Sequence, residues 1–169
     1  MAHKQLCGDQ WISLWQNEHG TTIVKMDDGV TIIPINKAGE VMMITEPSSA
    51  YDGLRSLLLP TGGLEGDEDP ADCANRELQE EMGYKAARLD FLGVTYLSIK
   101  YVQQKSHVFL ARNLEESTIE GDEPEGWIEA QKPIPLSEIE TLIAAGKLLN
   151  SGTIAALYMA RAFIEQEEA

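Results

Sequence analysis

Three glutamates in the middle of the chain have a spacing that could hold a metal ion. At about 100° per residue, Glu77, Glu80 and Glu81 would share one side of a helix. Like charges at this spacing repel one another, and Arg76 can offset only part of the repulsion through its i,i+4 partner Glu80. Grouped carboxylates are oxygen ligands suited to Mg²⁺ or Mn²⁺, whereas the alternative is an acidic face in solvent.

A glycine-rich segment, residues 60–66, precedes this helix and favours the metal site. Its three glycines within residues 62–66 permit unusual backbone angles and the close approach of another group. A backbone carbonyl of such a loop can join carboxylates as a metal ligand, and substrate phosphates usually complete a Mg²⁺ shell. The sequence therefore predicts a Mg²⁺ site, with Mn²⁺ as a possible substitute, where the loop meets the helix.

Residues 62–84 resemble the Nudix box of the Nudix hydrolases, Gly-x5-Glu-x7-Arg-Glu-U-x-Glu-Glu-x-Gly-U, where U is a bulky apolar residue. Leu78 meets the first U, and Tyr84 meets the last one loosely because aliphatic residues are usual there. The fixed glycine and polar positions of the box are all matched, by Gly62, Glu68, Arg76, Glu77, Glu80, Glu81 and Gly83.

The resemblance implies a metal-dependent hydrolase of nucleoside diphosphates linked to another moiety. Bound metal would neutralise the pyrophosphate, polarise the attacked phosphorus and lower the pKa of a water. Glu68 and Arg76 would be structural, with Arg76 orienting the glutamates. The implied metal ligands are three catalytic glutamates and one backbone carbonyl, from Glu77, Glu80, Glu81 and Thr61.

The general base is left open by the resemblance, because family members take it from the box or from a later loop. Residues 119–126 carry four acids within six positions, bounded by glycine and proline. They are either a solvated turn or part of the site, in which case Glu123 or Glu120 is a metal ligand or the base. A base must reach the attacking water directly or through one further water.

Substrate preference is indicated by residues outside the box. Where ADP-ribose hydrolases often have a proline and a glutamate, this chain has Ile99 and Leu58, and Tyr101 stands where dinucleoside-polyphosphate hydrolases often have a tyrosine. The acidic segment followed by Trp127 and residues 135–138 resembles hydrolases of ADP-ribose, NADH and related ADP compounds. We expect ADP compounds of this kind as substrates, with Tyr101 as a candidate contact.

Two further contacts are expected. Arg55 precedes the glycine loop in a chain poor in positive charge, which suggests a contact with a substrate phosphate. Residues 1–20 lie outside the minimal domain, residues 21–169, and in the ADP-compound group such extensions help to build a homodimer. Trp11 and Trp15 either cover their own sheet or, in a dimer, Trp15 stacks on a nucleobase.

Other functions compatible with the box remain as alternatives. They are hydrolysis of dinucleoside polyphosphates, hydrolysis of modified nucleoside triphosphates, and nucleotide sensing without turnover. A sensor would be expected to lose box glutamates, and this chain keeps them all. The negative charge argues against a fourth role, removal of mRNA caps.

The elements that must position the site alternate between strands and helices. Asp69 is expected to cap a helix over residues 70–82, with Pro70 at its first position and Gly83 as a left-handed terminator. The order predicts an α+β fold, an α/β/α sandwich of a mixed sheet flanked by helices. Strands are expected at 21–25 and 30–35 about a hairpin-type turn at 27–29, and at 41–45 after a turn at 36–39. Further strands are expected at 91–97, 107–111 and 127–130. Two closing helices are expected, from Ser137 to about Gly146 and over 151–166.

Composition limits the partners. The chain has 169 residues and a formal net charge of −15, which suits one domain and opposes simple electrostatic binding to nucleic acid or anionic membranes. Two cysteines, Cys7 and Cys73, and no apolar leader or span predict a cytoplasmic protein in a reducing compartment. An anionic nucleotide would be repelled by the acidic clusters unless metal were bound first, which predicts strict metal dependence.

Overall fold

The computed structural model describes residues 3–117, 128 and 130–169. Its helices are α1 (Pro70–Met82), α2 (Ile139–Ala144), which follows a 3-10 turn at Leu136–Glu138, and α3 (Ser151–Glu167). Its strands are β1 (His3–Gly8), β2 (Ile12–Asn17), β3 (Thr22–Met26), β4 (Gly29–Pro34), β5 (Glu40–Pro47), β6 (Arg55–Leu58), β7 (Thr61–Gly63), β8 (Tyr84–Tyr96), β9 (Val102–Gln103), β10 (Lys105–Glu116) and β11 (Ala130–Pro135).

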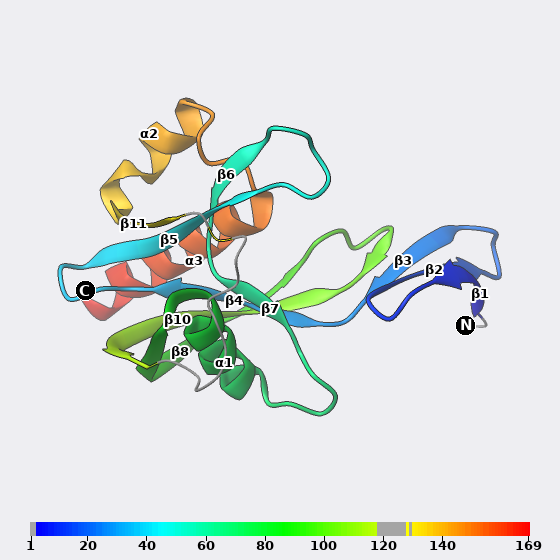
Figure 1. Ribbon diagram of the computed structural model, residues 1–169, viewed down its shortest axis with the longest axis horizontal. Helices are drawn as coiled ribbons and strands as arrows, with labels where there is room; N and C mark the ends of the chain where they lie inside the picture. The colour runs from blue at the N-terminus through cyan, green and yellow to red at the C-terminus, as the bar shows by residue number, and fades with distance from the viewer. Residues whose placement is uncertain (1–2, 118–127, 129) are drawn as a thin grey trace.

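A four-stranded sheet in the order β7-β4-β10-β8 lies between helices α1 and α3 (Figure 1). Strand β10 runs parallel to β4 and antiparallel to β8. Because side chains alternate across a strand, Ile32 packs with Leu78 of α1, and Ile33 packs with Leu157 of α3. The predicted α/β/α sandwich is confirmed.

A second sheet, in the order β11-β5-β6, extends both cores. Strand β5 is antiparallel to its two neighbours. Val41 and Met43 join the core under α3, while Ile44 joins the core under α1. This sheet therefore contributes residues to the cores under both helices.

The N-terminal sheet, β1-β2-β3-β9, projects from the body and has no buried residue in any of its strands (Figure 1). The predicted hairpin about residues 27–29 is wrong, because β3 pairs with β2 and β9 whereas β4 pairs with β7 and β10. Asp28 instead lies where the chain passes from β3 of the N-terminal sheet to β4 of the central sheet, and it is held there by two hydrogen bonds. Its carboxylate accepts the Lys105 amide at 3.0 Å, and its carbonyl accepts the Leu64 amide at 2.9 Å.

The ends of α1 are as predicted. Asp69 accepts a hydrogen bond from the Ala71 amide at 2.8 Å, Pro70 is the first helical residue, and Gly83 has a φ of 73°. The apolar stripe of α1 includes Ala74 and Leu78, both fully buried.

The caps of the closing helices differ from the prediction. Ser137 lies inside the 3-10 turn and makes no cap, while Asn150 caps α3 by accepting from the Thr153 amide at 2.9 Å. Strands β8 and β10 are longer than predicted because they pair with each other along most of their length. The strand expected at 127–130 lies mostly outside the described residues. No helix in the described part of the chain is long and apolar enough to cross a membrane.

Candidate active site

The three glutamates of α1, here called the carboxylate cluster, lie where the helix meets β7. Glu77 and Glu81 are each only 7% exposed, and Glu80 is half-buried. The Thr61 amide of β7 donates a hydrogen bond to Glu81 Oε2 at 3.3 Å. Burying carboxylates is costly unless they are hydrogen-bonded or paired, so their position is unlike that of a solvated acidic face.

Gly62 lets the loop approach the helix. A Cβ at this position would lie 1.7 Å from Glu77 Cδ and 2.0 Å from Glu77 Oε1. The neighbouring Gly63 is different, because a Cβ there would meet nothing within 4 Å. The first glycine of the box is therefore required by the space that the Glu77 carboxylate occupies.

Arg76 joins the cluster to the glycine loop. Its Nη1 donates to Glu77 Oε1 at 2.7 Å and to Glu80 Oε2 at 3.1 Å. Its Nε and Nη2 bind the two oxygens of Glu68, both at 3.0 Å, and Nη2 also donates to the Gly63 carbonyl at 3.0 Å. This forked pairing lowers the pKa of Glu68 and raises that of Arg76, mainly through their mutual hydrogen bonds.

The donors of this site fit a hard divalent cation. In the described residues no group of three His, Cys, Asp or Glu side chains is arranged as a ready metal site, and Arg76 contacts two of the cluster's glutamates. The chemistry nevertheless matches, because three carboxylates of one helix lie beside a glycine loop that comes within contact distance of Glu77.

The acidic segment that contains Glu120 and Glu123 lies outside the described residues. Its described flanks are both bound to the C-terminal end of α1. The Ser117 amide donates to the Gly83 carbonyl at 2.9 Å, and Gln79 Nε2 donates to Ser117 Oγ at 2.8 Å. On the other flank, Gln131 Nε2 donates to the Met82 carbonyl at 3.1 Å.

The predicted substrate contacts lie in two places. Arg55 begins β6, where it is exposed and pairs with Pro47 of β5. Trp15 belongs to β2 and Tyr101 directly precedes β9, so both are part of the N-terminal sheet or next to it. That sheet lies away from α1, which carries the carboxylate cluster (Figure 1). Lys25 Nζ covers the Trp15 ring at 4.1 Å from its centroid, and the Trp15 Nε1 donates to Ser13 Oγ at 2.9 Å.

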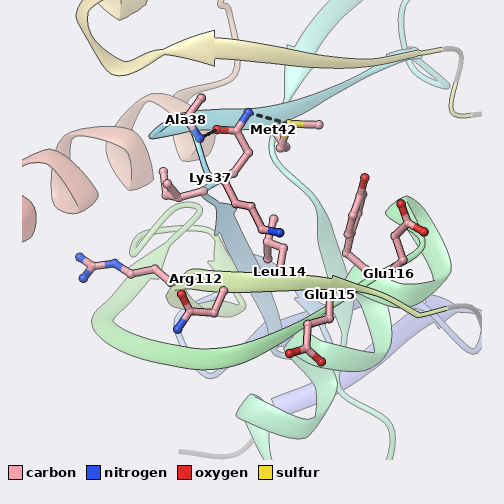
Figure 2. A pocket seen from close by; sticks show the side chains of 11 residues that line it. Lys37, Ala38, Met42, Arg112, Leu114, Glu115 and Glu116 are labelled. Atoms are coloured by element: carbon pink, nitrogen blue, oxygen red, sulfur yellow. Dashed lines mark hydrogen bonds between the residues drawn. The ribbon is translucent and has the colours of Figure 1, made fainter.

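Two cavities flank the second sheet. The larger, about 1110 Å³, lies between the β4–β5 turn and the end of β10, where Lys37 reaches toward Leu114 and Glu115 points away (Figure 2). The smaller, about 490 Å³, lies beside β6 and includes Glu46. Sequence reasoning missed Glu46, although its alternation with Met42 and Ile44 places a carboxylate next to apolar residues on one strand face.

Comparison with known proteins identifies relatives of the chain. An ADP-ribose pyrophosphatase of Bacillus subtilis (strain 168) is 33% identical over 93 residues, covering 54% of this chain and 49% of that protein. The ADP compounds hydrolase NudE of Escherichia coli (strain K12) is 29% identical over 138 residues, covering 82% of this chain and 72% of that protein. A GDP-mannose pyrophosphatase of Yersinia enterocolitica is 25% identical, covering 93% and 92%.

The fold has a solved counterpart. The crystal structure of an ADP compounds hydrolase superposes with a TM-score of 0.80 at 23% identity, covering 99% of this chain and 94% of that one. The chain thus matches about half the length of its Bacillus subtilis relative and nearly all of this structural neighbour. The NUDIX domain model matches residues 25–153, and the chain therefore belongs to the Nudix family.

Proposed function

We propose that this protein hydrolyses a pyrophosphate bond in a nucleoside diphosphate linked to another moiety, with Mg²⁺ as its metal and Mn²⁺ as a substitute. The observation that carries the proposal is the carboxylate cluster, in which Glu77 and Glu81 are withdrawn from solvent against β7. Carboxylates kept at this cost beside a close-packed glycine loop are suited to binding a cation.

The chain's own residues hold and orient the reacting groups. Glu77, Glu80, Glu81 and the Thr61 carbonyl would hold the metal, which when bound supplies charge neutralisation and a water of lowered pKa. Arg76 holds the carboxylates of Glu77 and Glu80 in position by hydrogen bonds, and the Thr61 amide holds the carboxylate of Glu81. The buried setting strengthens these electrostatic interactions and reduces reorganisation during reaction.

The proposal includes a residue of the acidic segment as the general base or a further metal ligand, Glu123 or Glu120. Support comes from the flanks of the segment, since Ser117 and Gln131 are both hydrogen-bonded to the C-terminal end of α1. Glu80 and Glu81 precede that end by one turn or less. The described flanks of the segment are thus held beside the helix turn that carries Glu80 and Glu81.

The substrates we favour are ADP-ribose, NADH and similar ADP compounds. Two relatives are named for ADP-ribose and for ADP compounds, and the second of them matches 82% of this chain. Hydrolysis would give AMP and the phosphorylated remaining moiety. We propose that Arg55 contacts a phosphate of the substrate, since it opens the strand that leads into β7.

We also propose a homodimer in which the N-terminal sheet, with residues 1–20 as its first part, contacts a second copy. Its strands have no buried residue, and Leu6 and Trp11 are 48% and 67% exposed. A sheet without a buried face gains stability by covering apolar surface. In such a dimer Trp15 and Tyr101 would serve the partner's substrate.

A substrate panel tests the proposed function. Product release is measured from ADP-ribose, NADH, diadenosine polyphosphates, nucleotide sugars and nucleoside triphosphates, with Mg²⁺ and with a chelator. The proposal expects turnover of ADP compounds that disappears with the chelator. Absence of turnover on every compound would favour a nucleotide sensor, and preference for triphosphates or diadenosine polyphosphates would favour one of the other hydrolase classes.

A further inference from the structure

A cavity of about 490 Å³ lies beside β6, and we call it the β6 pocket. Its size is within the range of small-molecule sites, about 300–1,000 Å³. Its walls come from the β5–β6 loop, from both strands and from the start of α3. The lining residues that bear on its chemistry are Glu46, Ser48, Tyr51, Ser56, Leu58 and Asn150.

The strand β6, which lines the β6 pocket, leads along the chain into the glycine loop beside the carboxylate cluster. Glu46 pairs with Ser56, and Ile44 pairs with Leu58, so these residues lie on one face of the sheet. Ile44 and Leu58 pack in the core under α1. Thr61, which binds Glu81, follows Leu58 by three residues, at most about 11 Å of extended chain.

Glu46 is the one charged residue that lines this pocket among the described residues. It is half-buried, and no described residue donates a hydrogen bond to its carboxylate. Burial raises its pKa, as expected for a carboxylate that loses water without gaining a partner. Such a group is available to accept hydrogen bonds from a ligand.

The remaining lining fits a neutral ligand with hydroxyl groups. Ser48 Oγ accepts the Ala50 and Tyr51 amides at 3.2 and 3.1 Å, which leaves its hydroxyl hydrogen for another acceptor. Tyr51 is 68% exposed and Leu149 is 49% exposed, so apolar surface is available for the carbon face of a sugar. No lysine or arginine of the described lining would hold a phosphate.

The geometry points to the β6 pocket as the subsite for an uncharged, hydroxyl-bearing sugar attached to the diphosphate, with Glu46 as a specificity-determining residue. Its carboxylate accepts hydrogen bonds from the sugar hydroxyls and repels a moiety that carries a further phosphate. This inference rests on the proposed function and narrows it to diphosphates whose second moiety is a neutral sugar, such as the terminal ribose of ADP-ribose.

A pair of substrates that differ by one phosphate tests the inference. Steady-state kinetics are measured with ADP-ribose and with ADP-ribose phosphorylated on its terminal ribose, for the wild type, Glu46→Gln and Glu46→Lys. We expect the wild type to prefer ADP-ribose. Glu46→Lys should raise the KM for ADP-ribose about tenfold or more, lower it for the phosphorylated compound and leave kcat within a few-fold. The KM values of Glu46→Gln should lie between those of the wild type and those of Glu46→Lys.

The control is Glu138→Gln, an exposed carboxylate in the 3-10 turn that does not line the β6 pocket. It should behave as the wild type on both substrates. If Glu46→Lys changed both substrates by the same factor, or neither, the inference would be wrong while the proposed hydrolysis stood. If the wild type turned over neither compound nor any of the panel, the proposed function itself would fail.

Discussion

The loop–helix region of β7 and α1 and the N-terminal sheet use their side chains in different ways. In the first, Glu77 and Glu81 are 7% exposed and Arg76 makes hydrogen bonds to three glutamates. In the second, no strand has a buried residue, and Trp11 is 67% exposed. The first region is determined by contacts within the chain, whereas the second leaves most of its side chains at the surface.

In the proposed function, this difference separates chemistry from recognition. Reacting groups must be held within narrow limits, so they lie where packing and hydrogen bonds fix their positions. Surfaces that choose a partner or a substrate can be exposed and less constrained by the fold. Substitutions in the loop–helix region should therefore affect kcat and stability strongly, whereas substitutions in the N-terminal sheet should affect assembly or KM.

The largest effect is expected from Glu81→Gln. It removes one negative charge from the carboxylate cluster but keeps the shape, so kcat should fall by about a hundredfold or more. The melting temperature should change little, since the amide can still accept the hydrogen bond of the Thr61 amide. Initial rates at saturating substrate measure kcat, and thermal unfolding measures the melting temperature. A stable variant of near-normal activity would remove Glu81 from the site.

Next is the pair Gly62→Ala and Gly63→Ala. The first Cβ would lie 1.7 Å from Glu77 Cδ, whereas the second would meet nothing within 4 Å. Gly62→Ala must displace the carboxylate or the loop, so we expect about a tenfold or greater loss of kcat, of the order that misplaced catalytic groups cause. Gly63→Ala should retain nearly full activity. Equal losses in both variants would show that the close approach at Gly62 has no special role.

Arg76→Met and Arg88→Met compare a clamped arginine with a surface one. The Arg76 side chain is 22% exposed and binds buried carboxylates, while that of Arg88 is 47% exposed. Loss of the first should cost about 1–3 kcal/mol of unfolding free energy, because buried charges lose their partner. Loss of the second should lower the unfolding free energy by a smaller amount, because exposed ion pairs contribute little to stability. Urea unfolding measures both, and a greater cost at Arg88 would contradict the comparison.

A smaller effect is expected in the pH dependence of stability. Hydrogen bonding by Arg76 lowers the pKa of Glu68 from its usual 4.5. A lowered pKa contributes stability above the unfolded value and loses it as pH falls through the folded value. The stability gap between the wild type and Glu68→Gln should therefore be larger at about pH 7 than at about pH 3. A gap that is constant or grows on acidification would contradict the pairing.

The smallest effect on chemistry is expected in the N-terminal sheet. Trp11→Ser replaces an exposed side chain that the body does not contact extensively. It should leave kcat within about twofold, as surface changes usually do, and weaken self-association if this sheet forms the dimer. Sedimentation velocity over a range of concentrations measures the second property. A large loss of kcat with unchanged assembly would reverse the roles of the two regions.

Sequence reasoning could predict the site elements because their signals are local. Asp69, Pro70 and Gly83 each specify a helix end through their own backbone or side chain, and the spacing of the three glutamates fixes their common face. The same logic failed at residues 27–29. A turn signal is the same whether the flanking strands pair with each other or with distant partners, and here Asp28 binds Lys105 instead.

Other features depend on contacts that a linear pattern does not contain. Glu46 becomes notable only when β5 pairs with β6 and the start of α3 closes a pocket around it. Ser137 has the character of a helix cap, but the chain enters α2 through a 3-10 turn that places Pro135 and Glu138 at the cap positions instead. The lengths of β8 and β10 follow from their mutual pairing, which extends beyond their apolar centres.

Direct binding of Mn²⁺ tests the central claim, that the carboxylate cluster is a metal site, without reliance on any substrate. The free-ion electron paramagnetic resonance signal is recorded as Mn²⁺ is titrated into the wild type, Glu81→Gln and Glu138→Gln. We predict that the wild type and Glu138→Gln bind the ion alike and that Glu81→Gln binds it about tenfold more weakly or worse, as expected for loss of an ionised oxygen ligand. Binding by Glu81→Gln equal to that of the wild type would contradict the claim.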